Sequence, residues 1–365
     1  MGDLSLQARP RLAYIDNLKV ALTILVIVHH VGQAYGPTGG AWPVHQEVAR
    51  ATVLSPFFTV NRSFFMSLFF MISGYFMVAA YERHGLATFL RSRLVRLGIP
   101  VLGWAALSLL FRIFLLREPI TRWDDVIGAG HLWYLEHVLL FSVVYGLWRL
   151  LRGRRSLTVK PEARLPGTLA ILAVAAAIAV SSYLIRLWSP IDRWFNLLGF
   201  FSVAFADVPR DLTFFILGAV AFRRDWFVRY PARSGYAWLG VGLAAAALLY
   251  VYRLWLHTFI PVSSTVWSLA YPVWEAILCF GMCIGLLVIF RQALNFQGRL
   301  GTFLSANQYA AYVWQMLVIV PLQLALLNVP LCPLAKFGLV ALVGVPLTFL
   351  WSGLSRRTRL VRSVL

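Results

Sequence analysis

The first long apolar segment of the sequence holds two adjacent histidines, His29 and His30, near its end. Lys19 precedes His30 by 11 residues. On an α-helix that spacing is about three turns, so the two side chains share one face about 16 Å apart along the axis. Asp16 lies three residues before Lys19 and can form an ion pair with it. One helix face thus carries a cation near one boundary of the segment and an imidazole deeper within it.

An imidazole in this position is suited to proton transfer. Its ordinary pKa is about 6.5, so it can take a proton from a hydroxyl group that attacks a thioester and return the proton to the leaving group. We therefore predict that His30 is a general base, with Lys19 and Asp16 completing the catalytic set. An isolated histidine is more often simply satisfied by a neighbouring helix, but the adjacent His29 and the Gly/Pro/Trp-rich loop that follows favour a site.

A second group of residues is suited to binding phosphate. Arg93 and Arg96 are three residues apart and share a helix face. Guanidinium groups bind phosphate through paired hydrogen bonds. The alternative is that these charges only orient the helices in a membrane or bind anionic lipid headgroups.

A third group combines polar and aromatic side chains. His131, Trp133, Glu136 and His137 occur within seven consecutive residues at the start of an apolar segment. A carboxylate and two imidazoles beside aromatic rings could hold a sugar, whereas an aromatic belt at a membrane boundary is the alternative. We assign His29, His131, Trp133 and Glu136 to substrate binding. Glu275 is a further acid within an apolar segment, with no evident partner in the sequence.

The elements that position these residues are predicted to be transmembrane helices. The chain of 365 residues is 60% hydrophobic and only 13% charged, which is too apolar for a water-soluble fold. We predict an all-α, multi-pass membrane protein of about ten spans without a separate soluble domain in residues 1–365. Segments of about 20 apolar residues lie near 18–36, 57–81, 97–116, 131–150, 166–188, 211–228, 236–256, 267–290, 307–328 and 335–354.

The distribution of charge predicts the orientation of the helices. Most of the 33 Lys and Arg residues fall in clusters on one side of the ten spans, so the positive-inside rule places both termini in the cytoplasm. The first span is expected to stay as an anchor, since no cleavage pattern follows it. The loops on the opposite side are expected to be external, and 189–210 to include a re-entrant or interfacial piece. These loops are 37–56, 117–130, 189–210, 257–266 and 328–334.

Other classes of protein are disfavoured. The net charge of +19 comes from clusters between apolar segments, so we expect no nucleic acid as a partner. Cys279 and Cys283 lie four residues apart within an apolar segment and are expected to pack there. We expect no metal site and no tightly bound cofactor.

Several of these motifs together resemble membrane acyltransferase family 3, and within it the glucan biosynthesis protein C branch of glucan succinyltransferases. The family's first span carries an arginine and a histidine after an aspartate, where this chain has Lys19 in place of the arginine. Its ninth-span motif usually ends in histidine, where this chain has Gln315. The matching elements are Asp16, Lys19 and His30; Phe69 to Phe76; Arg93, Arg96 and Pro100; His131 to Trp133; Phe214 to Gly218; and Tyr309 to Gln315.

The resemblance implies transfer of an acetyl or succinyl group from cytoplasmic acyl-CoA to a hydroxyl of an extracytoplasmic glycan or similar acceptor. Acyl-CoA is then the donor substrate, with its phosphates expected at Lys19, Arg93 and Arg96. We expect a multi-pass protein of a bacterial inner membrane, in contact with lipids, and leave a homo-oligomer open. The alternative is a secondary transporter or glycan flippase, against which the lack of internal repeats argues.

Overall fold

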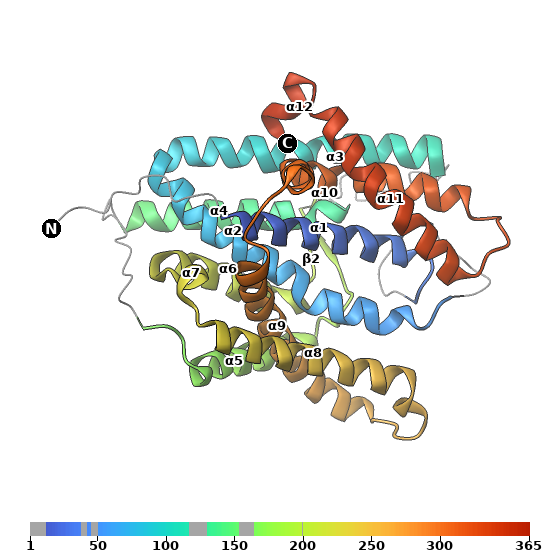
Figure 1. Ribbon diagram of the computed structural model, residues 1–365, viewed down its shortest axis with the longest axis horizontal. Coiled ribbons are helices and arrows are strands. Elements are labelled where there is room, and N and C mark those ends of the chain that lie inside the picture. Colours follow the sequence, from blue (N-terminus) through green and yellow to red (C-terminus); the bar gives the residue numbers. More distant parts are fainter. Residues whose placement is uncertain (1–11, 38–41, 45–49, 117–129, 153–163, 199) are drawn as a thin grey trace.

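The computed structural model describes residues 12–37, 42–44, 50–116, 130–152, 164–198 and 200–365. Within these residues the chain forms a bundle of helices with one short β-hairpin (Figure 1). Residues 117–129 of the predicted external loop 117–130 lie outside the described residues, as does the segment 153–163.

The bounds of the elements follow the apolar segments closely. The α-helices are α1 (Ala13–Gln33), α2 (Leu54–Arg93), α3 (Ile99–Phe111), α4 (Trp133–Leu151), α5 (Thr168–Arg186), α6 (Val208–Arg224), α7 (Trp226–Arg229), α8 (Ala232–Leu254), α9 (Ser264–Ala293), α10 (Arg299–Ala325), α11 (Pro333–Ser355) and α12 (Arg359–Val364). Shorter helical turns are η1 (Leu94–Gly98), η2 (Arg112–Leu116), η4 (Gly130–Leu132), η5 (Phe205–Asp207) and η6 (Leu256–Thr258).

Helix α1 lies near the centre of the bundle (Figure 1) and packs against α2, α9, α10 and α11. About half of its residues are buried, including the polar residues Thr23 and His29. Because α1 is surrounded by other helices, its polar side chains meet protein groups rather than lipid. This is the setting in which an ionisable side chain within an apolar helix can be satisfied.

The second and third predicted spans form one helical stretch that turns back at Gly85. Residues Leu54–Leu115 are helical over 62 residues, about 93 Å if straight, whereas a hydrocarbon core is about 30 Å thick. Gly85 has a φ of 68°, a value that glycine adopts without steric cost. The chain reverses there and α3 runs back along the bundle (Figure 1). Arg93 and Arg96 therefore lie on the returning part.

Helices α2 and α6 approach each other closely where the segment Phe69 to Phe76 meets the segment Phe214 to Gly218. A Cβ atom at Gly74 would collide with the carbonyl oxygen of Phe215, and one at Gly218 would collide with that of Met71. Neighbouring Ser73 shares a hydrogen bond of 2.6 Å with the hydroxyl of Tyr134. The lack of a side chain at Gly74 and at Gly218 thus allows α2 and α6 to pack closely.

The segment 189–210 has more structure than the sequence indicated. Strands β1 (Phe195–Leu197) and β2 (Phe201–Val203) pair antiparallel, with Asn196 opposite Ser202. The short turn η5 follows, and α6 begins at Val208, three residues earlier than predicted. Pro209 fits the first turn of α6 because the amide groups there have no partner within the helix.

Of the helices in the described residues, seven are long and apolar enough to cross a membrane. The sequence predicted ten spans. The difference arises at three places. Leu54–Leu115 counts once although it folds back, and α6 has only 17 residues. Helix α10 is continuous, but the glutamines at 308, 315 and 323 make it less apolar. The helical class is as predicted, while the number of crossings and the side of the termini stay predictions.

Candidate active site

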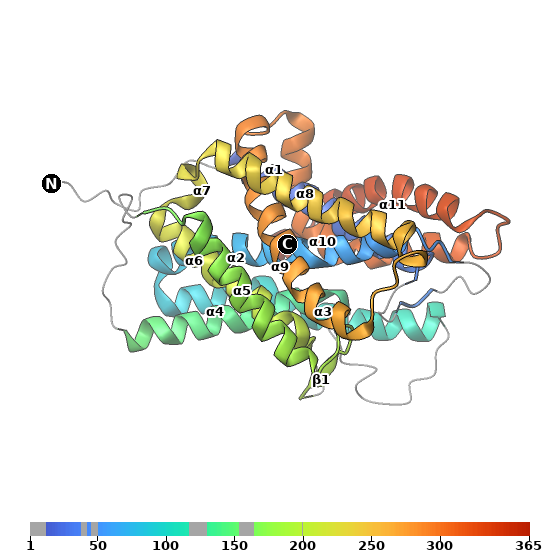
Figure 2. The same cartoon turned by 90° about the horizontal axis from the view of Figure 1, so that it is seen from below.

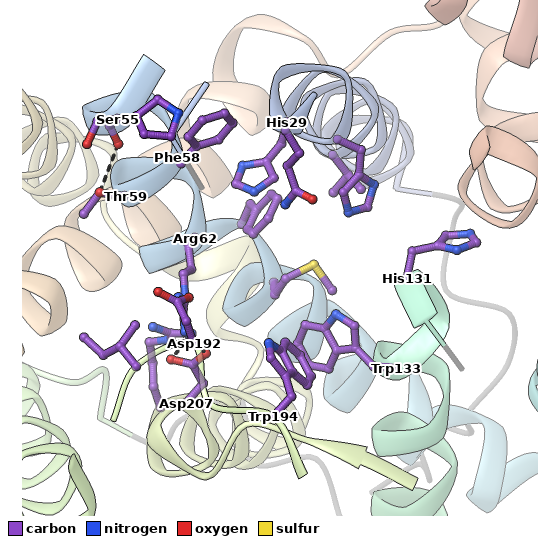
Figure 3. Close-up of a pocket in the computed structure, with 18 of the residues that line it drawn as sticks. His29, Ser55, Phe58, Thr59, Arg62, His131, Trp133, Asp192, Trp194 and Asp207 are labelled. Carbon is purple, nitrogen blue, oxygen red and sulfur yellow. Dashed lines mark hydrogen bonds and ion pairs between the residues drawn. The ribbon is translucent and has the colours of Figure 1, made fainter. Parts of the chain in front are cut away.

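A cavity of about 410 Å³ lies between α1, the start of α2, η4 and the segment that contains the β-hairpin. Figure 3 shows His29 and His131 on one side of it, with Arg62, Asp192 and Asp207 on another. Four of the predicted site residues, His29, His30, His131 and Trp133, line this cavity. Its other aromatic and charged lining residues are Phe58, Phe65, Trp194, Trp267, Tyr271, Tyr312, Arg62, Asp192, Asp207, Arg210 and Arg253.

The ring of His30 is held from two directions. Its Nδ1 atom lies 2.9 Å from Oε1 of Gln315, and its face stacks on Trp42 with the centroids 5.4 Å apart. Gln315 is completely buried, and its Nε2 donates to the carbonyl oxygen of Tyr312 at 2.8 Å. The amide therefore presents its oxygen to His30, so Nδ1 carries the proton and Nε2 carries the lone pair.

Trp42 is fixed in turn by α10. Its Nε1 donates to Oε1 of Gln323 at 2.9 Å, and Nε2 of Gln323 donates to the carbonyl oxygen of Val31 at 3.0 Å. These two hydrogen bonds connect the segment after α1, helix α10 and the backbone of α1 beside the histidines. The position of the His30 ring is thus determined by several elements rather than by α1 alone.

His131 lies next to His30, with ring centroids 6.2 Å apart. Its Nε2 is 3.1 Å from the carbonyl oxygen of Val313, so Nε2 donates and Nδ1 holds the lone pair. Tyr312 donates its hydroxyl to the carbonyl oxygen of His131 at 2.6 Å. The ring of Trp104 meets the imidazole edge to face at 4.5 Å. The imidazole of His131 is therefore held in one position in the wall of the cavity.

His29 points toward α2. Its ring lies 5.2 Å from that of Phe58 and 5.1 Å from that of Phe65. Its Nδ1 is buried and has no hydrogen-bond partner within the described residues. Adjacent residues on a helix point about 100° apart, which accounts for the different surroundings of His29 and His30. His29 therefore faces α2, whereas His30 contacts Gln315 of α10.

Arg62 forms a charged wall of the cavity that sequence reasoning missed. Its guanidinium pairs with Asp207 at 3.0 Å and with Asp192. Burial alone would raise the pKa of Asp207, but the guanidinium groups of Arg62, Arg210 and Arg186 outweigh it and hold this pKa below its usual range. Arg62 could have been found, because it is an arginine within the predicted span 57–81.

Arg210 also lines the cavity and is only 2% exposed. It pairs with Glu275, and its Nε donates to Oγ of Ser67 at 2.9 Å. Ser67 donates to Asp211 at 2.7 Å. Glu275, for which the sequence showed no partner, also pairs with Arg186. These buried charges have several partners each, and their contacts join α2, α5, α6 and α9 beside the cavity.

Comparison with known proteins identifies the chain at family level. A family model described as an acyltransferase domain, of the acyltransferase-3 type, matches residues 12–357. The chain belongs to the acyltransferase-3 family.

Curated relatives of this acyltransferase are named glucans biosynthesis protein C. Those from Salmonella schwarzengrund, Salmonella typhi and Salmonella typhimurium are each 29% identical over 264 residues, which cover 66% of this chain and 66% of each relative. The aligned part is thus just under two thirds of the length of these relatives. No solved structure matches the chain. The family assignment favours an enzyme over the transporter or flippase that the sequence left open.

Other predicted site residues of the acyltransferase lie away from the cavity. Glu136 does not line it, and its Oε2 accepts a hydrogen bond from the backbone of Ser202 at 3.1 Å. Glu136 therefore attaches the β-hairpin to α4. Lys19 and Asp16 form the predicted ion pair at 2.8 Å, at the other end of α1 from the histidines.

The two predicted phosphate-binding arginines also lie outside the cavity. The guanidinium of Arg93 lies over the ring of Phe89 at 5.3 Å. Arg96 is exposed, and its carbonyl oxygen accepts a hydrogen bond from the hydroxyl of Tyr309. This contact ties the returning helix to α10, the helix that also carries Gln315.

Proposed function

We propose that this acyltransferase moves an acetyl or succinyl group from cytoplasmic acyl-CoA to a hydroxyl group of an extracytoplasmic glycan. The observation that carries the proposal is the His30 ring in the cavity wall, with Nδ1 engaged by Gln315 at 2.9 Å. That contact directs the basic Nε2 away from α10. Nε2 has no hydrogen bond within the described residues, and an imidazole with one nitrogen fixed and the other available has the arrangement that general-base catalysis requires.

In the proposed step, Nε2 of His30 takes the proton of the acceptor hydroxyl as its oxygen attacks the thioester carbonyl carbon. A C–O bond forms, the C–S bond breaks, and the imidazolium returns its proton to the CoA thiolate. The products are an ester on the acceptor and free CoA, so no oxidant, metal or further reactant is needed. The neutral amide of Gln315 keeps the ring oriented in both protonation states.

The donor is proposed to approach from the end of α1 that carries Lys19. Arg93 and Arg96 offer the fork-shaped groups that bind phosphate well, while Lys19 contributes only a point charge. Lys19 lies 11 positions before His30 on the helix, a rise of about 16 Å. A thin pantetheine arm can cover such a distance along a helix face, and the nucleotide then stays with the cations.

The acceptor is proposed to occupy the cavity itself. Trp133 and Trp194 lie together, with ring centroids 5.4 Å apart, and apolar sugar faces pack on such rings. Arg62 and Asp192 provide polar groups for sugar hydroxyls. The name of the curated relatives refers to glucans, which supports a glycan as the acceptor class. We propose a bacterial inner membrane as the location.

The test is a direct transfer assay. Purified protein in lipid nanodiscs is incubated with acetyl-CoA or succinyl-CoA, with and without a soluble glucan, and free CoA thiol and acylated glucan are measured. We expect thiol release that depends on the glucan, together with ester formation in equal amount. Thioester turnover without any acylated glucan would argue against a glycan acceptor, and no turnover of either donor would argue against acyl-CoA.

A further inference from the structure

A second cavity shares no lining residue with the His30 cavity. It has a volume of about 380 Å³ and is formed by α5, α6, α7 and α9. The helices α5, α6 and α7 gather at the left of Figure 2. Side chains such as Ile171, Val174 and Leu217 make its walls apolar. An apolar groove of this kind accommodates a hydrocarbon chain.

The charged residues that line the groove are basic. Arg164 and Arg224 both line it, and no Asp or Glu of the described part of the chain does. Within the described residues neither guanidinium forms an ion pair. The guanidinium of Arg224 lies 5.9 Å from the ring centroid of Trp226. The Nε1 of Trp226 is a buried donor without a hydrogen-bond partner in the described chain. Arg164, Arg224 and Trp226 therefore bring two guanidinium groups and an unused N–H to the lining of one groove.

We propose that this groove binds one anionic phospholipid of the cytoplasmic leaflet, with an acyl chain between α5, α6 and α9 and the phosphate at Arg164, Arg224 and Trp226. Basic pockets between transmembrane helices on the cytoplasmic side are suited to anionic headgroups. Arg164 and Arg224 belong to the clusters that the positive-inside rule places in the cytoplasm. The two chemical features of the groove thus match the two parts of one lipid.

The donor substrate is a poorer match to this groove. Coenzyme A carries a polar pantetheine arm, for which the apolar walls offer no partners. A thioester bound here would also be separated from His30, because the two cavities have no residue in common. The lipid site is therefore distinct from the proposed reaction, and its test does not depend on acyl transfer.

The experiment measures lipid retention by native mass spectrometry after exchange into detergent with equal amounts of phosphatidylglycerol and phosphatidylcholine. We expect preferential retention of one phosphatidylglycerol. Because one basic residue near a membrane surface contributes about 1 kcal/mol, each of Arg164→Gln and Arg224→Gln should weaken retention about 5-fold. Arg233→Gln is the matched control, since Arg233 is exposed and does not line the groove. It should retain the lipid as the parent does.

Three results would overturn the proposal. They are equal retention of phosphatidylcholine, thermal protection by inorganic phosphate alone that equals protection by phosphatidylglycerol, and displacement of the lipid by acyl-CoA. Trp226→Phe serves if the arginine variants fail to fold, because it keeps the ring beside Arg224 but removes the N–H donor. It should lower retention of phosphatidylglycerol relative to the parent, and unchanged retention would count against the site.

Discussion

Nδ1 of His30 lies 2.9 Å from Oε1 of Gln315, a contact between α1 and α10 across 285 positions of sequence. Gln315 stands where the resemblance to the family led us to expect an imidazole. An amide oxygen accepts the Nδ1 proton as a second imidazole could, but it has no protonation equilibrium of its own near neutral pH. Gln315 can therefore orient His30 without competing with it for the proton.

Replacing Gln315 should affect the chemical step more than donor binding. Gln315→Leu removes the hydrogen-bond acceptor and leaves Nδ1 of His30 without a partner, so we expect kcat to fall about 10- to 100-fold through lost orientation, with little change in KM for acyl-CoA. Gln315→Glu should stabilise the imidazolium and move the acidic limb of the pH–rate profile to higher pH. Steady-state kinetics across pH checks both. An unaltered kcat in Gln315→Leu would exclude the positioning role.

The sequence was most informative where a local rule applied. Ionisable side chains in an apolar segment are costly, and this rule pointed to His29, His30 and His131, which the fold brings into one cavity. Ion pairs between helices that are far apart in the sequence could not be predicted in the same way. Glu275 finds Arg210 across 65 residues, and that contact depends on how α6 and α9 pack. The β-hairpin escaped prediction because its strands have only three residues each.

Close packing of α2 on α6 should be sensitive to one methyl group. A Cβ atom at Gly74 or Gly218 meets a backbone carbonyl of the other helix, so Gly74→Ala and Gly218→Ala should destabilise the protein by about 1 to 3 kcal/mol. The measurement is the thermal unfolding midpoint in detergent. Gly240→Ala is the control, since a Cβ atom there meets nothing within 4 Å. Equal midpoints for all three variants would show that the interface can relax.

Arg93 and Arg96 should contribute to donor affinity. A hydrogen bond to a charged group is worth about 1.5 to 3 kcal/mol, so Arg93→Gln and Arg96→Gln should each weaken equilibrium binding of acyl-CoA about 10-fold or more. Arg91→Gln, which removes an exposed charge of the same helix, should bind as the parent does. If all three variants bind acyl-CoA equally well, the pair serves only to orient the helices.

The predicted orientation can be tested with reporter fusions. A fusion after Arg164 and one after Arg362 should report a cytoplasmic location, because both follow clusters of Lys and Arg. A fusion within residues 41–51 should report an external location. A cytoplasmic signal from this last fusion would contradict the predicted topology and would place the His30 cavity on the wrong side for an external acceptor.

The two adjacent histidines should differ in their effect on catalysis. His30 stacks on Trp42 and contacts Gln315, whereas His29 lies among the rings of Phe58 and Phe65. Loss of a general base costs about 10²- to 10⁴-fold in rate. We therefore expect His30→Ala to lower kcat by that amount while acyl-CoA affinity stays near the parental value. His29→Ala should have a milder effect, because it removes a packing contact rather than a base.

Direct measurement of acyl transfer, beside acyl-CoA binding, separates these roles. His257→Ala provides a matched control, because His257 is exposed and lies outside the cavity, and it should leave both quantities unchanged. Added imidazole should restore part of the activity of His30→Ala if the missing function is proton transfer. A larger loss in His29→Ala than in His30→Ala would move the base to His29. Near-parental turnover by His30→Ala would refute the proposed mechanism, although the family assignment would stand.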